Sequence, residues 1–220
     1  MTYTFHWEVP LQNLPQFLWG ALATLEMSGV ACLLGSLVAV GGALARLSKN
    51  KYLRRTATAY VEIIRNTPFI VQLFYVYFGL VTVGINLEAF SVAIITLTLN
   101  CGAYCTEIIR AGIQSIHKGQ REAAFSLGMT EGQSMFLVVL PQAVRRILPP
   151  LAGQFITLIK DSSLISVIAV SDLTYVAKNI VTNTFRAFEV WLAIAVFYFV
   201  LSFALSWSVR SLEYRLAKSD

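Results

Sequence analysis

Long apolar stretches separated by short polar segments make up most of this chain. Four stretches contain no Asp, Glu, Lys or Arg, at residues 27–45, 66–87, 89–106 and 190–209. A fifth, at about 136–159, is interrupted only by Arg145 and Arg146. A helix needs roughly 20 apolar residues to cross a bilayer core about 30 Å thick. The pattern therefore predicts an all-α integral membrane protein with five transmembrane helices.

We assign these helices to one transmembrane domain that covers residues 1–220. The spans are expected at about 17–45, 57–80, 89–112, 136–160 and 190–212. Small residues in the first span, among them Gly20, Gly35 and Gly42, predict tight helix contacts, because helices in lipid associate where their backbones approach closely. The most polar internal segment, at about 114–134, predicts a loop outside the bilayer between the third and fourth spans.

The second predicted span contains a proline, Pro68. Because proline has no N–H, Pro68 cannot donate to the carbonyl of Ile64 four residues earlier. We therefore expect a kink in this span and another donor for the freed carbonyl, since an unpaired carbonyl is costly in lipid.

Charge distribution predicts the orientation. Charged residues make up 13% of the chain, against about 25% in soluble domains. Basic residues gather after the first span, around the 114–134 loop and in the tail, which carries Arg210, Arg215 and Lys218. The positive-inside rule assigns these segments to the cytoplasm and the amino terminus to the outside. The net charge of +5 thus reflects topology, and no nucleic-acid binding is indicated.

A sequence motif lies in and after the polar loop. It consists of Glu122-Ala123-Ala124, then Gly128, and then Val138-Val139-Leu140-Pro141. This resembles the EAA motif of ABC importer permeases, which reads Glu-Ala-Ala, three residues, Gly, nine residues, Ile, any residue, Leu and Pro. Only Val138, in place of Ile, departs from that pattern. Two alanines make a slim helix and Gly128 permits a sharp turn after it, so the helix suits a groove on a partner protein.

The resemblance extends over roughly Leu14 to Leu216 and narrows to permeases for polar amino acids. It rests on four further segments, Tyr60–Pro68, Tyr104–Ile113, Leu140–Ala143 and Lys160–Leu164. Similar runs occur in importers of glutamate, glutamine, histidine, arginine and opines. The resemblance implies a type I ABC importer permease with a cytoplasmic coupling helix in a bacterial inner membrane, and it leaves the particular amino acid open.

The same resemblance implies the partners. A separate ATPase subunit would dock on the coupling residues Glu122, Ala123, Ala124, Gly128, Leu140 and Pro141. That subunit would bind ATP and Mg, since this chain has no Gly-x-x-x-x-Gly-Lys-Ser/Thr loop, and we expect no cofactor of its own. An extracytoplasmic amino-acid-binding protein, membrane lipid, and either a second copy or a related permease complete the set.

Charged side chains at membrane depth cost about 2.5–3.5 kcal/mol, so each needs a partner or a wet path. Glu62 with Arg65, and Glu107 with Arg110, have the i,i+3 spacing of helical ion pairs, which is a sufficient structural explanation. Asp161 could either meet the ammonium group of an amino acid or form a structural ion pair or cap. The candidate residues of a substrate path are Glu62, Asn66, Thr67, Asn100, Tyr104, Glu107, Asp161, Ser162 and Ser163. The neutral ones could instead join helices.

Two other function classes compete with this interpretation. A secondary transporter or channel would use intramembrane carboxylates without an ATPase, but such folds usually contain inverted repeats, and this sequence shows none. A membrane enzyme is less favoured, because the two histidines, His6 and His117, belong to no catalytic or metal-ligand set. Cys32, Cys101 and Cys105 fit buried small residues, and we assign them no chemistry.

Overall fold

The computed structural model describes residues 3–217, without the side chains of residue 210 and residues 212–217, so the predicted tail charges at Arg210, Arg215 and Lys218 lie outside the described residues. All regular secondary structure in the described residues is helical, which confirms the predicted all-α class. Its elements are α1 (Glu8–Gln12), α2 (Leu14–Leu47), α3 (Lys51–Arg65), α4 (Phe69–Thr82), α5 (Ala89–Gln114), α6 (Lys118–Ser126), α7 (Glu131–Gln133), the π-helical η1 (Ser134–Val139), α8 (Leu140–Asp161), the 3₁₀-helical η2 (Ser162–Ile168), α9 (Leu173–Thr184) and α10 (Ala187–Ala217).

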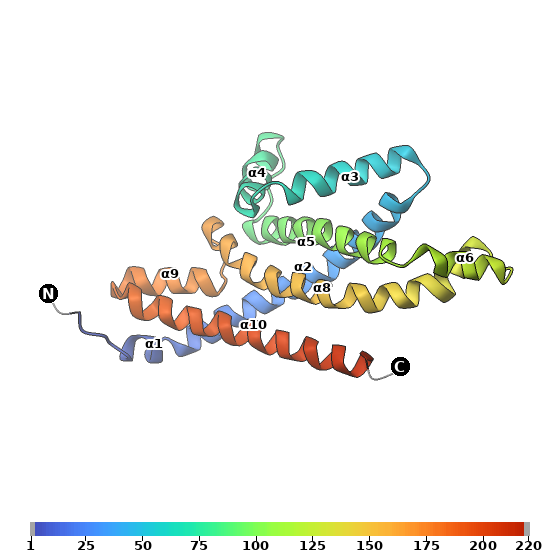
Figure 1. The fold of residues 1–220 in the computed structure, drawn as a ribbon. Helices are drawn as coiled ribbons and strands as arrows, with labels where there is room; N and C mark the ends of the chain where they lie inside the picture. The colour runs from blue at the N-terminus through green and yellow to red at the C-terminus, as the bar shows by residue number, and fades with distance from the viewer. Residues whose placement is uncertain (1–2, 218–220) are drawn as a thin grey trace.

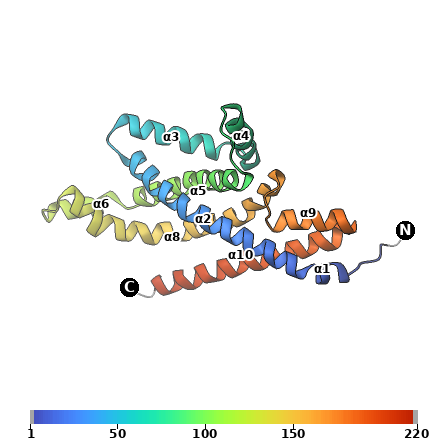
Figure 2. The same cartoon turned by 180° about the vertical axis from the view of Figure 1, so that it is seen from behind.

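The long helices α2, α5, α8 and α10 extend along the long dimension of the molecule, and α2 crosses the others obliquely (Figure 1). Helix α5 packs on α2 and α8, and α3 lies alongside α5. The view from behind shows α9 and α10 together at the end where the amino terminus lies (Figure 2). The opposite end carries α6, the turn between α2 and α3, and the carboxyl terminus. The 114–134 loop and the α2–α3 turn, which the sequence assigns to the cytoplasm, therefore lie at the same end of the molecule.

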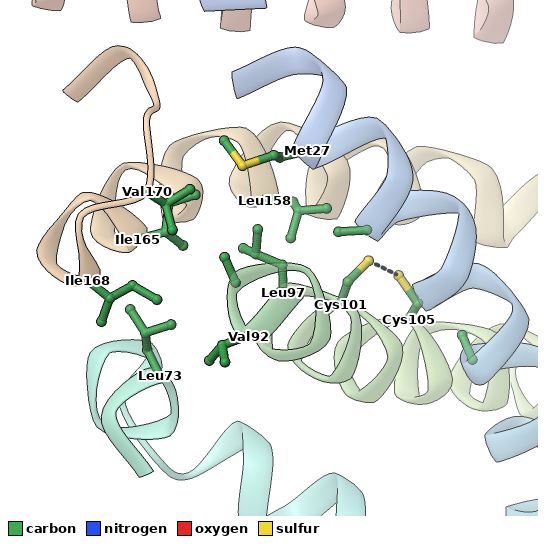
Figure 3. Packing of buried hydrophobic residues seen from close by; sticks show 13 residues of the cluster. Met27, Leu73, Val92, Leu97, Cys101, Cys105, Leu158, Ile165, Ile168 and Val170 are labelled. Carbon is green, nitrogen blue, oxygen red and sulfur yellow. Dashed lines mark hydrogen bonds between the residues drawn. The ribbon is translucent and has the colours of Figure 1, made fainter. Parts of the chain in front are cut away.

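Helices α2 and α5 pack closely because glycines, which have no side chain, lie on α2 where the two helices cross. A Cβ atom added to Gly35 would lie 2.9 Å from the Cβ of Cys101, and one added to Gly42 would lie 2.4 Å from Oγ1 of Thr106. The predicted tight packing of the first span is thus confirmed. Around this crossing, side chains of α4, α5, α8 and η2 form the main apolar core, with Leu73 and Leu97 both fully buried (Figure 3).

Four helical runs within the described residues are long and apolar enough to cross a membrane: Leu14–Leu47, Ala89–Gln114, Glu131–Ile168 and Ala187–Val209. They overlap the predicted first, third, fourth and fifth spans. The fourth is longer than predicted because η1 and η2 extend α8 at both ends.

The second predicted span, at 57–80, is not one kinked helix. Helix α3 ends at Arg65, and α4 begins at Phe69 after a break. Helix α4 has 14 residues and is about 21 Å long, too short to cross the bilayer core alone. The reason is Pro68, which starts α4 as its N-cap in an extended conformation and so ends the helical path. As predicted, the carbonyl of Ile64 receives another donor, Nε2 of Gln72 at 2.8 Å.

Candidate functional site

The helix that contains the Glu-Ala-Ala segment, α6, ends in a tight turn. The N–H of Met129 donates to the carbonyl of Ala124 at 3.1 Å, and the N–H of Gly128 donates to the carbonyl of Phe125 at 2.9 Å. These two bonds form a Schellman motif, which places the residue after the C-cap in the left-handed region. Gly128 has φ +80°, so the predicted sharp turn at this glycine is confirmed.

After the turn, the chain enters the short helix α7, which has an N-terminal cap, and then the π-helical turn η1. The hydroxyl of Thr130 accepts from the N–H of Gln133 at 3.3 Å, and the Gln133 side chain accepts from the N–H of Thr130 at 2.9 Å. The π-helical turn η1 then leads into Leu140 and Pro141. A wide turn fits here because Pro141 cannot donate to the carbonyl four residues before it.

Contacts between helices hold the loop to the bundle. Nε2 of Gln142 donates to Oε1 of Gln120 at 3.1 Å, and Nη1 of Arg146 donates to the carbonyl of Ser115 at 2.8 Å. A small apolar cluster lies beneath, formed by Ile113, Ile116, Val139, Ala143 and Ile147. The loop therefore sits on the ends of α5 and α8.

The outer face of the loop is exposed. Glu122, Ala123 and Pro141 are exposed, whereas Ala124 faces inward and is buried. Large apolar side chains also point outward, with Leu127 79% and Phe136 68% exposed. Leu127 lies outside the four runs that are long and apolar enough to cross a membrane, and an exposed apolar side chain of this size outside the bilayer is a feature of protein interaction surfaces.

A cavity of about 450 Å³ opens beside the α3–α4 break. Its walls come from α3, α4, α5, α8 and the break itself: Arg65, Asn66, Thr67, Pro68, Phe69, Asn100, Tyr104, Gln154, Thr157 and Asp161. The structure thus brings together five of the nine predicted path residues, namely Asn66, Thr67, Asn100, Tyr104 and Asp161.

The cavity contains charges of both signs. The guanidinium of Arg65 lies over the ring of Tyr104, 5.5 Å from its centroid, in a cation–π arrangement. Asp161 is half-buried at the end of α8. Glu62 and Arg65 make contacts other than the predicted ion pair, since Nδ2 of Asn66 donates to the Glu62 carboxylate at 3.2 Å. Arg65 is therefore available to the cavity.

Four predicted path residues do not line the cavity. Glu62 is exposed on α3, and Ser162 is buried, where its hydroxyl donates to the carbonyl of Ile159 at 2.8 Å. Ser163 follows it in η2. Glu107 accepts from Nη1 of Arg46 at 2.6 Å and from Nε of Arg110 at 2.9 Å, so the predicted Glu107–Arg110 pair is confirmed.

Sequence reasoning missed several lining residues. Gln154 and Thr157 precede Asp161 by seven and four residues, a spacing that places all three on one face of α8. That periodicity was the available signal. The i,i+3 spacing of Arg65 and Glu62 predicts only an ion pair, although the place of Arg65 three residues before Pro68 also favours a polar cavity.

Another buried carboxylate, Asp172, lies apart from the cavity. It caps α9 by accepting from the N–H of Tyr175 at 2.7 Å, and the hydroxyl of Tyr198 donates to it at 3.3 Å. Burial raises the pKa of Asp172 to about 6. Its partners come from α9 and α10, which explains it as a structural residue.

Comparison with known proteins decides between the function classes. Residues 31–218 match the family described as "Binding-protein-dependent transport system inner membrane component". This chain belongs to that family. It is a permease component of an inner membrane and spans that membrane several times, and the ATPase of the system is a separate subunit.

The relatives of this permease match it over nearly its whole length. The glutamine transport system permease protein GlnP of Escherichia coli (strain K12) is 38% identical and covers 96% of this chain and 98% of its own length. The probable glutamine ABC transporter permease protein GlnM of Bacillus subtilis (strain 168) is 43% identical, covering 94% and 96%. The L-cystine transport system permease protein TcyB of the same organism is 39% identical, covering 96% and 91%.

Solved structures agree with this assignment. One chain from a crystal structure of an amino acid ABC transporter with histidines is 40% identical, covers 97% of this permease and 100% of its own length, and has a TM-score of 0.93. A chain of the inward-facing MetNI methionine ABC transporter, 22% identical with a TM-score of 0.70, shares the fold over 90% of this permease and 96% of its own length. The predicted permease fold is thus confirmed.

Proposed function

We propose that this permease forms the translocation path of an ATP-driven importer for polar amino acids. The names of its relatives support this substrate class, since they include permeases for glutamine, L-cystine and nopaline. The chain has no ATPase site of its own, and energy reaches it through contact with the separate ATPase subunit.

The cavity beside the α3–α4 break is the main structural support for an amino-acid substrate. A free amino acid has a carboxylate and an ammonium group, and the cavity has a guanidinium at Arg65 and a carboxylate at Asp161. Amide and hydroxyl groups of Asn66, Thr67 and Asn100 add hydrogen-bonding capacity. Its volume of about 450 Å³ is within the usual range of small-molecule sites, about 300–1,000 Å³.

We call the segment from about 114 to 134, together with Leu140 and Pro141, the coupling loop. It is the proposed docking site for the ATPase. Glu122, Ala123, Gly128 and Pro141 lie in the exposed segment, and Phe125 and Leu127 supply apolar contact area. Ala124 is buried on the inner side of the loop, and Leu140 is half-buried where α8 begins. A rigid loop fixed to α5 and α8 would transmit ATPase closure to the helices that line the cavity.

The remaining partners follow from location and charge. Basic residues at the α6 end favour a cytoplasmic position for it, so the amino terminus and α9 would face outward. A binding protein would deliver the amino acid at that outer end. Arg65 and Asn66 are exposed at the cavity mouth, where lipid contact would be costly, so a second permease copy or a related permease would cover them.

Reconstitution tests this proposal. The permease is placed in vesicles with its ATPase and its binding protein, and uptake of labelled glutamine, cystine, histidine and arginine is measured. We expect uptake that requires ATP, and an ATPase rate that rises when the binding protein is loaded. Uptake by this chain alone, driven by a proton gradient without ATP, would show instead that it is a secondary transporter.

A further inference from the structure

The break between α3 and α4 leaves two backbone carbonyls without a backbone donor of good geometry. Pro68 has no N–H for the carbonyl of Ile64, and the N–H groups of Val71 and Gln72 both donate to the carbonyl of Pro68. The nearest backbone donor to the Ile64 carbonyl is the N–H of Thr67 at 3.4 Å, a long bond. Both carbonyls, of Ile64 and Thr67, therefore depend on a side chain.

One buried side chain supplies both donors. Nε2 of Gln72 lies 2.8 Å from the carbonyl oxygen of Ile64 and 2.7 Å from that of Thr67. Gln72 is 6% exposed and stands on the first turn of α4, so its amide reaches back across the break. It joins the end of α3 to the start of α4 as a backbone hydrogen bond would in an unbroken helix.

A second buried amide fixes the orientation of the first. Nδ2 of Asn100 donates to Oε1 of Gln72 at 3.1 Å, and Asn100 is 4% exposed. Because two carbonyl oxygens require the NH₂ side of Gln72, only its oxygen can face Asn100, which must then donate. Every polar group of the Gln72 amide is thus assigned one role.

Helix α5 anchors both sides of the break at adjacent residues. The hydroxyl of Tyr60, on α3, donates to the carbonyl of Leu99 at 2.6 Å, and Asn100 holds Gln72 on α4. Leu73, the neighbour of Gln72, points into the core beside Val92 and Ile168 (Figure 3). The angle of the break is therefore set by α5 and by the Gln72 amide.

We infer that Gln72 and Asn100 are positioning residues for transport: they hold the α3–α4 break so that Arg65, Asn66 and Thr67 face the cavity. Gln72 does not line that cavity and acts through the backbone of the break. The inference rests on the proposed function in one respect, namely that the amino acid binds in this cavity.

Uptake kinetics give the first test, made on the reconstituted complex. Gln72→Met keeps the length of the side chain and removes both donors. We expect the half-maximal substrate concentration to rise about tenfold or more, because two buried carbonyls lose their partners. ATPase association should not change. The matched control is Thr96→Val, which removes a buried hydrogen bond within α5 alone and should leave the half-maximal concentration unchanged.

A titratable variant separates positioning from packing. In Gln72→Glu the ionised carboxylate has no donor for either carbonyl, whereas the protonated carboxyl has one. Its uptake rate relative to the wild type should therefore increase as the pH falls from 8 to 5.5. The same ratio for Gln72→Met should stay flat, and the unchanged Arg65 and Asp161 cancel in both ratios. Equal pH profiles for the two variants would overturn the inference.

A distance measurement tests the break without relying on transport. Spin labels replace Ile63 on α3 and Tyr75 on α4, both exposed, in a background in which alanine replaces Cys32, Cys101 and Cys105. Labelled permease is mixed with excess unlabelled permease, so that only distances within one chain are measured. Gln72→Met should broaden the distance distribution, and Thr96→Val should not.

The two readouts distinguish the possible failures. An unchanged distance distribution in Gln72→Met overturns the positioning role whatever binds in the cavity. A broadened distribution with an unchanged half-maximal concentration also overturns it, because the break would then move without affecting transport. If Asp161→Asn too leaves that concentration unchanged, the proposed cavity itself is wrong.

Discussion

In the coupling loop, the hydrogen bonds that shape the backbone join residues three to five positions apart, such as Met129 with Ala124 and Gln133 with Thr130. In the cavity, the bonds from Gln72 to Ile64 and Thr67 are short in sequence, but the wall is fixed to the bundle by contacts between residues 28 and 39 positions apart, Asn100 with Gln72 and Tyr60 with Leu99. The loop is thus built from local sequence, and the cavity is built from the packing of four helices.

This difference separates two kinds of effect. A substitution at the turn or the cap of the loop should alter docking while leaving the bundle intact, because the bonds that form the turn and the cap lie within the loop. A substitution near the cavity should alter substrate affinity through helix positions. Variants that break one region and leave the other unchanged therefore test the comparison.

Gly128→Asp should have the largest effect, on docking. The new charge lies in the proposed interface, and a side chain at φ +80° adds strain that glycine avoids. We expect co-purification of the ATPase with the permease to fall at least about tenfold, while the permease remains folded. Gly132→Asp is the control, since Gly132 is in the same loop without positive φ and its added Cβ meets no atom within 4 Å. Normal stoichiometry in Gly128→Asp would remove this residue from the docking site.

Gly112→Ala should disturb the support beneath the loop. Its Cβ would lie 2.2 Å from Cγ1 of Ile147, a buried and β-branched residue of α8. Overpacking of this kind costs about 1–3 kcal/mol, so the melting temperature of the purified permease should fall by several degrees. Gly153 lies in α8, like Ile147, and a Cβ added there meets no atom within 4 Å, so Gly153→Ala should not lower the melting temperature. Equal melting temperatures would mean that α5 and α8 can move apart freely.

Asp161→Asn should act on the cavity alone. Loss of a charged partner for the ammonium group should raise the half-maximal substrate concentration about tenfold, with ATPase association unchanged. Asp172→Asn makes the same substitution at a buried carboxylate outside the cavity, and asparagine can still cap α9. Its half-maximal concentration should equal that of the wild type. A similar rise in both variants would indicate a general effect of carboxylate loss.

The contrast between the regions also explains what could be predicted from the sequence. The loop was recognisable from the spacing of Glu122, Gly128 and Pro141, and its sharp turn was predictable because such a turn favours glycine at Gly128. The cap formed by Thr130 and Gln133 was not predicted, although their separation by three residues was an available signal. Apolar run lengths were likewise sufficient to predict four of the five helical spans. Both signals are local.

The cavity was only partly predictable because its geometry is not local. Pro68 indicated a kink, but whether the helix continues depends on Gln72 and Asn100, which meet only in the folded bundle. The same holds for Glu62 and Arg65, whose spacing fits an ion pair although Tyr104, on another helix, offers Arg65 a different contact. Spacing within one helix does not reveal such competing partners.

The smallest expected effects compare a bond within the loop with a bond from the loop to the α2–α3 turn. Thr130→Ala removes a helix cap and should cost about 1 kcal/mol of local stability. Lys49→Ala removes the ion pair with Glu131 at 2.9 Å, whose side chains are 88% and 73% exposed, so we expect a smaller cost than that of the lost cap. Amide hydrogen exchange over residues 118–134 measures both. If the loop is held locally, exchange should accelerate in Thr130→Ala and remain nearly unchanged in Lys49→Ala. The reverse order would mean that the loop depends on the α2–α3 turn, and that the two regions are built more alike than their hydrogen bonds indicate.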